Sequence, residues 1–341
     1  MGDNFSNSIT EWYTQFQRNL PWRNTRNPYK VWLSEIILQQ TQVVQGLKYY
    51  NKFVQKFPKI EFLAAADEQE VLNLWQGLGY YSRARNLHFT SKYIVNELKG
   101  EFPNTYSELI KLKGVGHYTA AAIASFCYEE NVAVLDGNVF RVLARHFGIH
   151  TAINSPQGIR EFKALSQELL PKLNASTYNQ AIMEFGALQC KHSNPHCDSC
   201  PLSHSCEAYR KQEQKLLPFK EKKSKVKDLE IDFYIIKYKE KIMLTQRKES
   251  GIWKNLWEFP SIHSDKKSNL DLKNITIVHS SPKIKHLLSH RRILATFHLC
   301  AAKSKLTQKN TKWILPADIQ DFPIHRLMDK FLESNPNYLK H

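Results

Sequence analysis

The feature that most constrains this sequence is a change in the pattern of apolar residues near residue 230, from helical periodicity to alternation. This change divides the chain into two parts of different fold class. Long amphipathic stretches dominate residues 8–210 and alternating patterns are rare there, so we expect this part to be mostly helical. Beyond it, two alternating runs at 232–238 and 242–247 flank a Glu240-Lys241 turn and predict a β-hairpin. Another strand is expected over 293–299. A chain of 341 residues has room for two such domains.

We therefore expect a helical catalytic region over 1–212, a basic linker over 213–229 and an α+β domain over 230–341. The linker prediction depends on a run of lysine and arginine residues that Pro218 interrupts. Such a segment either stays solvated or contacts phosphates, and the sequence leaves both interpretations open.

The charge balance indicates the class of partner. Lys and Arg outnumber Asp and Glu by 48 to 32, a formal net charge of +16. Such a surface attracts polyanions, so nucleic acid is the expected partner and a generically basic protein is the alternative. No apolar run approaches the ~18 residues that a membrane span needs, and no signal peptide is recognisable. We expect a cytoplasmic monomer with no membrane partner, associated with the nucleoid if the source is a bacterium.

Four of the six cysteines gather in one short segment: Cys190, Cys197, Cys200 and Cys206. Clustered cysteines in a reducing compartment are typical of metal ligands, whereas the isolated Cys127 and Cys300 are expected in hydrophobic cores. Zinc sites usually bring their ligands in two close pairs, which this spacing does not do. One loop wrapped around a four-iron four-sulfur cluster fits the spacing better, and zinc is the alternative.

Residues 104–128 carry the clearest local pattern. Thr105 and Glu108 predict a capping box that begins a helix, Gly114 and Gly116 end it, and a second helix follows from about His117. Two short helices joined in this way form a helix-hairpin-helix, whose glycines and free N–H groups bind a DNA phosphate without reading the base sequence. An ordinary helical hairpin with a glycine stop is the alternative.

Two carboxylates stand out. Glu35 lies in a strongly apolar helical stretch, where burial would raise its pKa and let it act as a general acid. The alternative is a glutamate that reaches the surface. Asp136 is placed to cap a helix, either as a plain cap or as a carboxylate that the helix dipole keeps ionised. One protonated and one ionised carboxyl group form the glycosidase pattern.

Together these segments resemble the adenine DNA glycosylase (MutY) family of the helix-hairpin-helix DNA glycosylase superfamily. The matching segments cover nearly the whole chain in family order: Pro21-Trp22-Arg23, residues 34–42, 77–85, 114–120 and 135–139, the four clustered cysteines, and residues 251–260. The resemblance implies a multidomain fold, with an all-α helix-hairpin-helix glycosylase domain that has an iron-sulfur loop, and a C-terminal α+β Nudix-like domain. It also implies a 4Fe-4S cluster held by the four cysteines.

The resemblance assigns roles to the catalytic candidates. Glu35 would protonate the adenine and later activate water, and Asp136 would face the sugar cation, with Tyr118 and Asn138 in support. Endonuclease III relatives carry a lysine at the position of Tyr118, and that lysine attacks the sugar and makes them strand-cutting lyases. A tyrosine hydroxyl cannot form a Schiff base, so this chain resembles the monofunctional branch.

The same resemblance implies a set of DNA contacts. The expected partner is double-stranded DNA that carries adenine opposite 8-oxoguanine or guanine, with the adenine flipped out of the stack. Residues expected to line the base pocket, enter the stack or lie close to the lesion are Trp22, Arg23, Gln40, Thr41, Leu78 and Tyr80. Gly114 and Gly116 would hold a phosphate.

The C-terminal part resembles the Nudix-like module that reads 8-oxoguanine. The family's lesion-reading loop usually runs Phe-Ser-His, and here it is Leu288-Ser289-His290, so Ser289 and His290 carry over while the aromatic residue is lost. A true Nudix hydrolase needs a glutamate-rich metal site. Between Pro260 and this loop the only acidic residues are Asp265 and Asp271, so hydrolase activity is not expected.

Two other functions are compatible with parts of the pattern. An endonuclease III-like pyrimidine glycosylase and lyase would need a lysine in place of Tyr118. A non-catalytic iron-sulfur protein that binds DNA or senses redox state would not need both Glu35 and Asp136.

Overall fold

The computed structural model describes residues 2–221, 227–249, 251–265, 270, 273–288 and 291–339. Their contacts form two compact units. The helical unit comprises Met1–Ala65 and Phe89–Lys222, and the sheet unit comprises Ala66–His88 and Lys223–His341. A short stretch from the first half of the chain therefore packs with the C-terminal residues.

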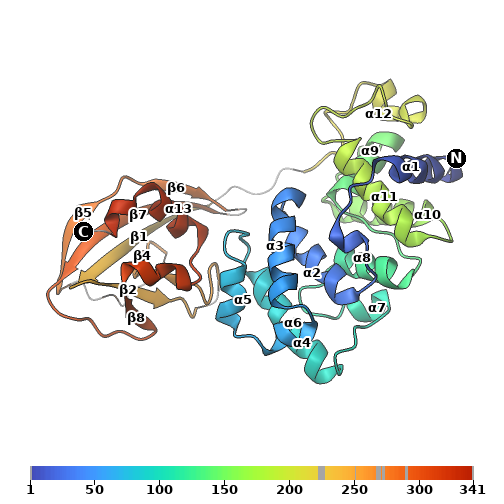
Figure 1. Ribbon diagram of the computed structural model, residues 1–341. Helices are drawn as coiled ribbons and strands as arrows, with labels where there is room; N and C mark the ends of the chain where they lie inside the picture. Colours follow the sequence, from blue (N-terminus) through green and yellow to red (C-terminus); the bar gives the residue numbers. More distant parts are fainter. Residues whose placement is uncertain are drawn as a thin grey trace. The chain divides into compact units, whose positions relative to one another are not determined.

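The helical unit contains only helices and loops among its described residues, as the amphipathic pattern predicts (Figure 1). No described helix in the chain is both long and apolar enough to cross a membrane. α6 (Ser82–Glu97) begins in the sheet unit and continues into the helical unit. The other helices of this unit are α1 (Gly2–Phe16), η1 (Pro21–Arg23), α2 (Pro28–Leu38), α3 (Val43–Lys56), α4 (Ile60–Ala65), α7 (Tyr106–Leu109), α8 (His117–Tyr128), α9 (Gly137–Phe147), α10 (Pro156–Glu168), α11 (Ala175–Leu188), η2 (Ser203–Ser205) and α12 (Glu207–Arg210).

Local capping sets the ends of the helices that carry the candidate residues. Asn27 begins α2, because its side chain accepts from the Lys30 N–H over 3.1 Å and Pro28 occupies the first helical position. Asp136 caps α9, which ends at Gly148 with φ +64°. The buried helix α11 packs against α1, α8 and α9 and forms the centre of the hydrophobic core.

The predicted helical hairpin is present, but the prediction of a capping box at its start is wrong. α7 begins after Thr105, as expected, yet the Thr105 side chain makes no capping hydrogen bond. Glu108 forms an ion pair with Lys111 instead of reaching back to the cap. The Tyr106 N–H donates to Glu130 Oε2 over 2.6 Å, so a residue distant in sequence supplies the cap.

The residues at the C-terminal end of the helical unit, which include part of the predicted linker, are bonded to the rest of that unit. Leu217 is buried, and its carbonyl accepts from Arg145 Nε over 3.1 Å. The Ile153 N–H donates to the Phe219 carbonyl over 3.0 Å. The part of the basic run at 222–226 lies outside the described residues.

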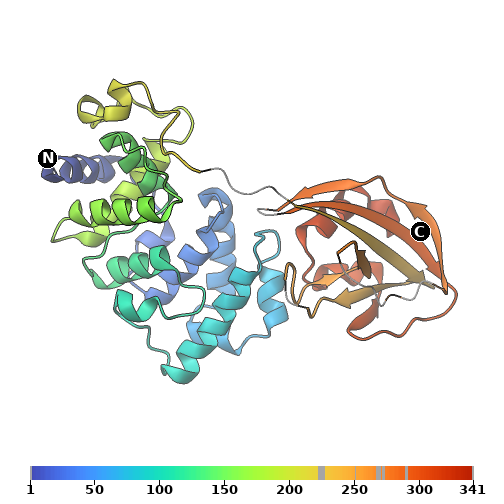
Figure 2. The ribbon, with the colours of Figure 1, turned by 180° about the vertical axis from the view of Figure 1, so that it is seen from behind.

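The sheet unit is built on one mixed eight-stranded sheet, with the order β3-β2-β1-β7-β5 and with β4, β6 and β8 paired to β1, β7 and β2. β1 and β7 run parallel and side by side, visible as the long gold and orange strands in Figure 2, and every other pairing is antiparallel. The strands are β1 (Lys227–Tyr238), β2 (Lys241–Gln246), β3 (Trp257–Glu258), β4 (Ser261–His263), β5 (Ile275–Ser280), β6 (Ile284–Leu287), β7 (Arg291–Ala302) and β8 (Thr311–Ile314). The helices are α5 (Glu68–Leu74), η3 (Pro316–Asp321), α13 (Arg326–Ser334) and η4 (Pro336–Tyr338).

The predicted hairpin and the strand over 293–299 are confirmed, the latter within β7. β1 and β2 pair with Lys237 opposite Ile242, so the turn is Lys239-Glu240, one residue earlier than expected. Lys239 takes a left-handed φ of +53° there, which a tight hairpin turn requires.

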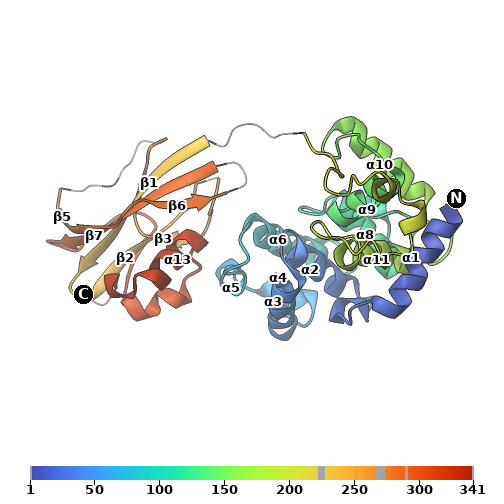
Figure 3. The same ribbon diagram turned by 90° about the horizontal axis from the view of Figure 1, so that it is seen from above.

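Aromatic stacking forms the core of the sheet unit. Phe233 of β1 and Phe297 of β7 are register partners, and their rings stack at 4.9 Å. Phe331 stacks on Phe297 at 3.8 Å and thereby holds α13 on one face of the sheet (Figure 3). Burial of three phenylalanines on one face is a large apolar contribution to the stability of this unit.

Candidate active site

A cavity of about 540 Å³ in the helical unit brings together residues that are far apart in sequence. Helices α2, α8, α9 and α11 and the segment around η1 supply its walls. Eight of the residues predicted from sequence line it: Trp22, Arg23, Glu35, Gln40, Thr41, Tyr118, Asp136 and Asn138.

Glu35 is a buried acid at one wall of this cavity. Only 5% of its surface is exposed, so the sequence-based expectation of a desolvated carboxyl is confirmed. The pKa of Glu35 is raised to about 7, because burial, the largest cause, and the nearby Asp136 outweigh the Tyr118 hydrogen bond and the Arg23 charge, which act in the opposite direction. The carboxyl group therefore exchanges its proton close to neutral pH.

Tyr118 of α8 is the direct partner of Glu35. Its hydroxyl donates to Glu35 Oε2 over 2.6 Å and lies 3.7 Å from Met183 Sδ. Burial, together with the two neighbouring carboxyl groups, raises the pKa of Tyr118 well above its ordinary value. The phenol thus stays protonated and serves as a hydrogen-bond donor.

Asp136 caps α9 and faces the same cavity. Its Oδ1 accepts from the Asn138 and Val139 N–H groups and its Oδ2 accepts from Asn138 Nδ2, each over 2.8 Å. Burial raises the pKa of Asp136, and these three donors and the Arg141 charge oppose that effect. Arg141 Nη2 also donates to Asn138 Oδ1 over 2.9 Å, which orients the Asn138 amide group toward Asp136.

A buried ion network beside these residues was not anticipated from sequence. Glu184 of α11 is 1% exposed and accepts hydrogen bonds from Arg18 Nε and Arg23 Nη1, each over 2.8 Å. Burial raises the pKa of Glu184, but hydrogen bonds from both arginines and the Arg23 charge outweigh it and lower the pKa to about 2. Like Glu35, Glu184 stands in an apolar helical stretch, and that signal could have identified it. Arg18 carries no such signal.

The four clustered cysteines lie between the end of α11 and the start of α12, and among the described residues no group of three or more His, Cys, Asp or Glu side chains is arranged to hold one metal ion. None forms a disulfide, and all four are partly buried. Burial raises the pKa of the Cys197, Cys200 and Cys206 thiols. Arg145 Nη1 lies 3.4 Å from Cys190 Sγ. Cys127 and Cys300 are buried, as expected.

The glycine turn between α7 and α8 is open on one side. Gly114 has φ +82°, a conformation that favours glycine. Gly116 begins α8, and a Cβ added there would meet no protein atom within 4 Å. Nothing in the protein therefore requires glycine at position 116, and the backbone there is open to a group from outside.

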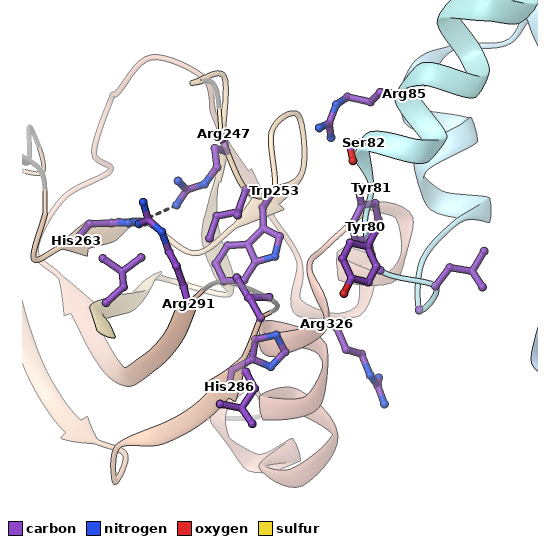
Figure 4. Close-up of a pocket in the computed structure, with 18 of the residues that line it drawn as sticks. Tyr80, Tyr81, Ser82, Arg85, Arg247, Trp253, His263, His286, Arg291 and Arg326 are labelled. Atoms are coloured by element: carbon purple, nitrogen blue, oxygen red, sulfur yellow. Dashed lines mark hydrogen bonds between the residues drawn. The ribbon is translucent and has the colours of Figure 1, made fainter. Parts of the chain in front are cut away.

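Leu78 and Tyr80 lie in the sheet unit and line a second cavity there, of about 720 Å³. Figure 4 shows Tyr80 and Tyr81 on one side of this cavity and Trp253 and His286 on the other. Leu288 contributes to the lining, whereas Ser289 and His290 lie outside the described residues.

Comparison with known proteins assigns a family to each of the two domains. A family model for HhH-GPD superfamily base excision DNA repair proteins matches residues 33–171, and a NUDIX domain model matches residues 233–334. These matches confirm the predicted all-helical and Nudix-like domains. An adenine DNA glycosylase from Buchnera aphidicola subsp. Baizongia pistaciae is 41% identical over 297 residues, which are 84% of this chain and 83% of that protein.

Solved structures show the same helical fold. A thermostable thymine-DNA glycosylase superposes with a TM-score of 0.57 at 28% identity, over 62% of this chain and 97% of that one. A non-covalent endonuclease III–DNA complex gives a TM-score of 0.54 at 24% identity, over 63% of this chain and 99% of that one.

Proposed function

The chain belongs to the adenine DNA glycosylase family of base excision repair, hydrolases of N-glycosyl bonds, and we propose that it removes adenine opposite 8-oxoguanine or guanine without cutting the strand. One observation carries this proposal: Glu35, Tyr118 and Asp136 surround a single cavity. A carboxyl group that titrates near neutrality and a carboxylate held by three N–H donors are the two groups that N-glycosyl hydrolysis needs.

The reaction begins with the adenine outside the duplex, because its reactive atoms are inaccessible within the stack. Glu35 then transfers its proton to a ring nitrogen of the base. The C–N bond breaks and its electron pair leaves with the adenine. Tyr118 holds the Glu35 carboxyl group in place through its 2.6 Å hydrogen bond.

Asp136 stabilises the oxocarbenium ion that the sugar becomes. Its carboxyl group is held in place by the cap of α9 before the reaction starts, so no reorganisation is needed when the cation forms. Glu35, now ionised, accepts a proton from water, and the water oxygen attacks the sugar carbon. The products are adenine and an abasic site, and Glu35 is protonated again.

The absence of an amine at position 118 supports the monofunctional assignment. A Schiff base with the sugar needs a primary amine, and a phenol with a pKa well above 10 offers neither an amine nor a phenolate. The strand therefore stays intact after the base has left.

We assign the DNA contacts to Gln40, Thr41, Leu78 and Tyr80, with Gly114 and Gly116 at a phosphate. Gln40 and Tyr80 have φ +55° and +47°, a strained conformation for residues other than glycine. Such strain is typical of functional sites. The open space at Gly116 supports close approach of the DNA backbone. Trp22 and Arg23 line the pocket for the flipped base.

Reading of 8-oxoguanine is assigned to the domain over 230–341, and catalysis to the region over 1–212. 8-Oxoguanine carries an N7–H donor that guanine lacks, so discrimination requires a hydrogen-bond acceptor. Ser289 is that candidate, with His290 beside it. The second cavity, which Leu78, Tyr80 and Leu288 line, supports a role of this unit at the lesion.

Cys190, Cys197, Cys200 and Cys206 would hold a 4Fe-4S cluster. The four cysteines have six, two and five residues between successive members, which is not the two close pairs that zinc sites usually use. A single loop with this spacing fits a four-iron four-sulfur cluster better. With four cysteine ligands such a cluster has no open iron site, so it would supply rigidity and charge rather than Lewis acidity.

One experiment separates this function from its alternatives. The protein is incubated with duplexes that contain adenine opposite 8-oxoguanine, or thymine glycol, and free base and strand breaks are measured with and without alkali. We expect adenine release, with strand breaks only after alkali. Release from thymine glycol with direct strand cleavage would indicate a lyase, and no base release would indicate a non-catalytic DNA-binding protein.

A further inference from the structure

The loop Gly77–Tyr80 is held in an unusual backbone conformation. Gly77, Gly79 and Tyr80 have φ +97°, +71° and +47°. Tyr80 nevertheless exposes 50% of its surface, although it is a large aromatic residue. A strained loop that presents an exposed ring needs other parts of the structure to hold it.

Part of this support comes from residues next to the loop. The buried Trp75 donates its Nε1 hydrogen to the Gly79 carbonyl over 3.0 Å. Arg83 Nη2 lies 3.3 Å from the carbonyl oxygens of both Leu78 and Gly79. The Arg83 guanidinium group also lies over the Trp75 ring and, at 5.8 Å, over the Tyr80 ring.

The remaining support comes from residues after position 250. The hydroxyl of Tyr81, which is 5% exposed, donates to the Ile324 carbonyl over 2.9 Å. Trp257 Nε1 donates to Gln69 Oε1 over 2.8 Å, and Gln69 Nε2 donates to the Asn255 carbonyl over 3.2 Å.

Further hydrogen bonds dock residues 66–88 on the C-terminal residues along α5 and the start of α6. Each joins a residue of 66–88 to one of the C-terminal residues: Asn255 Nδ2 to Glu68 Oε1, Asn73 Nδ2 to the Asp321 carbonyl, and Arg85 Nη1 to the Lys254 carbonyl. Figure 4 shows Tyr81 and Arg85 on the segment that faces Trp253. The contacts occur before and after the loop, so both of its ends are anchored.

We propose that the C-terminal residues position the Gly77–Tyr80 loop for the mispair, with Tyr81 and Gln69 as positioning residues. The inference rests on the proposed function, in which Leu78 and Tyr80 contact DNA. It gives the C-terminal domain a second role that is separate from reading the lesion through Ser289 and His290. The docking orders the loop before DNA arrives, so less ordering entropy is lost on binding.

The test uses the full chain with two substitutions that remove side-chain hydrogen bonds to the C-terminal residues. Tyr81→Phe removes the hydroxyl group that reaches Ile324. Gln69→Ala removes both of its hydrogen bonds and places a strong helix former in α5. Tyr93→Phe, the same chemical change at a tyrosine that is 44% exposed, is the matched control.

Two readouts are taken from each variant. The first is amide hydrogen exchange of residues 77–81 in the free protein. The second is single-turnover release of adenine, which gives a maximal rate and a half-saturating protein concentration. In Tyr81→Phe we expect exchange and half-saturation to rise about threefold to tenfold, the effect of losing one neutral hydrogen bond, and Gln69→Ala, which loses two, should raise both at least as much. The maximal rate should stay within twofold of wild type, because Glu35 and Asp136 are unchanged.

Coupling between Tyr81 and Tyr80 distinguishes positioning of the loop from a general weakening of DNA binding. In a Tyr80→Gly background, which keeps the left-handed backbone, adding Tyr81→Phe should raise the half-saturating concentration no further. Additive losses would overturn the inference, as would wild-type exchange and half-saturation in both docking variants.

The same set of variants separates failure of the inference from failure of the function on which it rests. Weak binding by Tyr80→Gly together with normal binding by Tyr81→Phe and Gln69→Ala would overturn only the positioning role. Normal binding by Tyr80→Gly would show instead that Tyr80 does not contribute to DNA binding, which removes the premise that the loop presents this ring to DNA.

Discussion

The hydroxyl of Tyr118 donates to Oε2 of Glu35 over 2.6 Å, which joins α8 to α2 at the wall of the cavity. The bond favours the ionised carboxylate, whereas burial favours the protonated acid. Burial is the larger effect, so the pKa of Glu35 rises to about 7 instead of higher still. The pair thus sets the acid close to the pH at which a general acid works best.

The pH dependence of base release should follow this carboxyl group. Proton donation needs the acid form, so the single-turnover rate should be constant below pH 7 and fall about tenfold per pH unit above it. Tyr118→Phe removes a bond to the ionised form, so it should raise the pKa and shift the falling limb to higher pH. A wild-type rate that stays flat from pH 6 to 9 would contradict this role for Glu35.

Tyr118→Lys should convert the enzyme into a weak lyase. An amine at this position can form a Schiff base with the sugar, so strand breaks should appear without alkali and borohydride should trap a protein–DNA adduct. Tyr118→Phe loses the same hydroxyl group and gains no amine, so it should give no adduct. Efficient trapping of the wild-type protein would show that the monofunctional assignment is wrong.

Purified protein should be yellow-brown and contain about four irons per chain. Cys197→Ser should lower iron content, folding yield and DNA affinity more than it changes the chemistry of bound complexes. Cys300→Ser, the same substitution at a buried cysteine of the sheet unit, should keep the iron. Stoichiometric zinc in protein produced with ample iron would refute the cluster.

Ser289→Ala combined with His290→Ala should reduce the preference for adenine opposite 8-oxoguanine over adenine opposite guanine. Loss of one specific hydrogen bond costs roughly 1–3 kcal/mol, which is about 10- to 100-fold in selectivity. The measurement is the ratio of single-turnover efficiencies on the two duplexes at several salt concentrations. An unchanged ratio, or equal weakening on both duplexes as salt rises, would mean that these residues add only non-specific affinity.

Patterns within short segments predicted much of the secondary structure and both catalytic carboxyl groups. The helical texture, the hairpin and β7 follow from periodicity, and Glu35 and Asp136 were identifiable because each stands out against its immediate neighbours. The cap on α9 also follows from local sequence, since Asp136 directly precedes the helix.

Contacts between distant segments could not be predicted in this way. Glu130 takes the place of the expected capping box, although it is 24 residues from Tyr106. Arg18 reaches Glu184 across 166 residues, and Tyr81 reaches Ile324 across 243. No periodicity within one segment encodes such pairs, because the fold brings them together only after each segment has formed.

Glu35→Gln should fold at least as well as the wild-type protein, which makes it a clean test of the chemistry. The folded state binds the Glu35 proton more tightly than the unfolded state, with a pKa of about 7 against 4.5. The stabilisation from this proton is therefore full below pH 4.5 and lost as pH rises through 7, a change of about 3 kcal/mol. Because glutamine does not titrate, the variant should gain stability relative to wild type as pH rises from 4.5 to 8.

The most direct test of the account is single-turnover release of adenine by Glu35→Gln from a duplex with adenine opposite 8-oxoguanine, at saturating protein. An amide cannot donate the proton, so the rate should fall by at least about 100-fold while the duplex remains bound with wild-type affinity. A rate within a few-fold of wild type in this bound complex would contradict the central claim that Glu35 is the acid that releases the base.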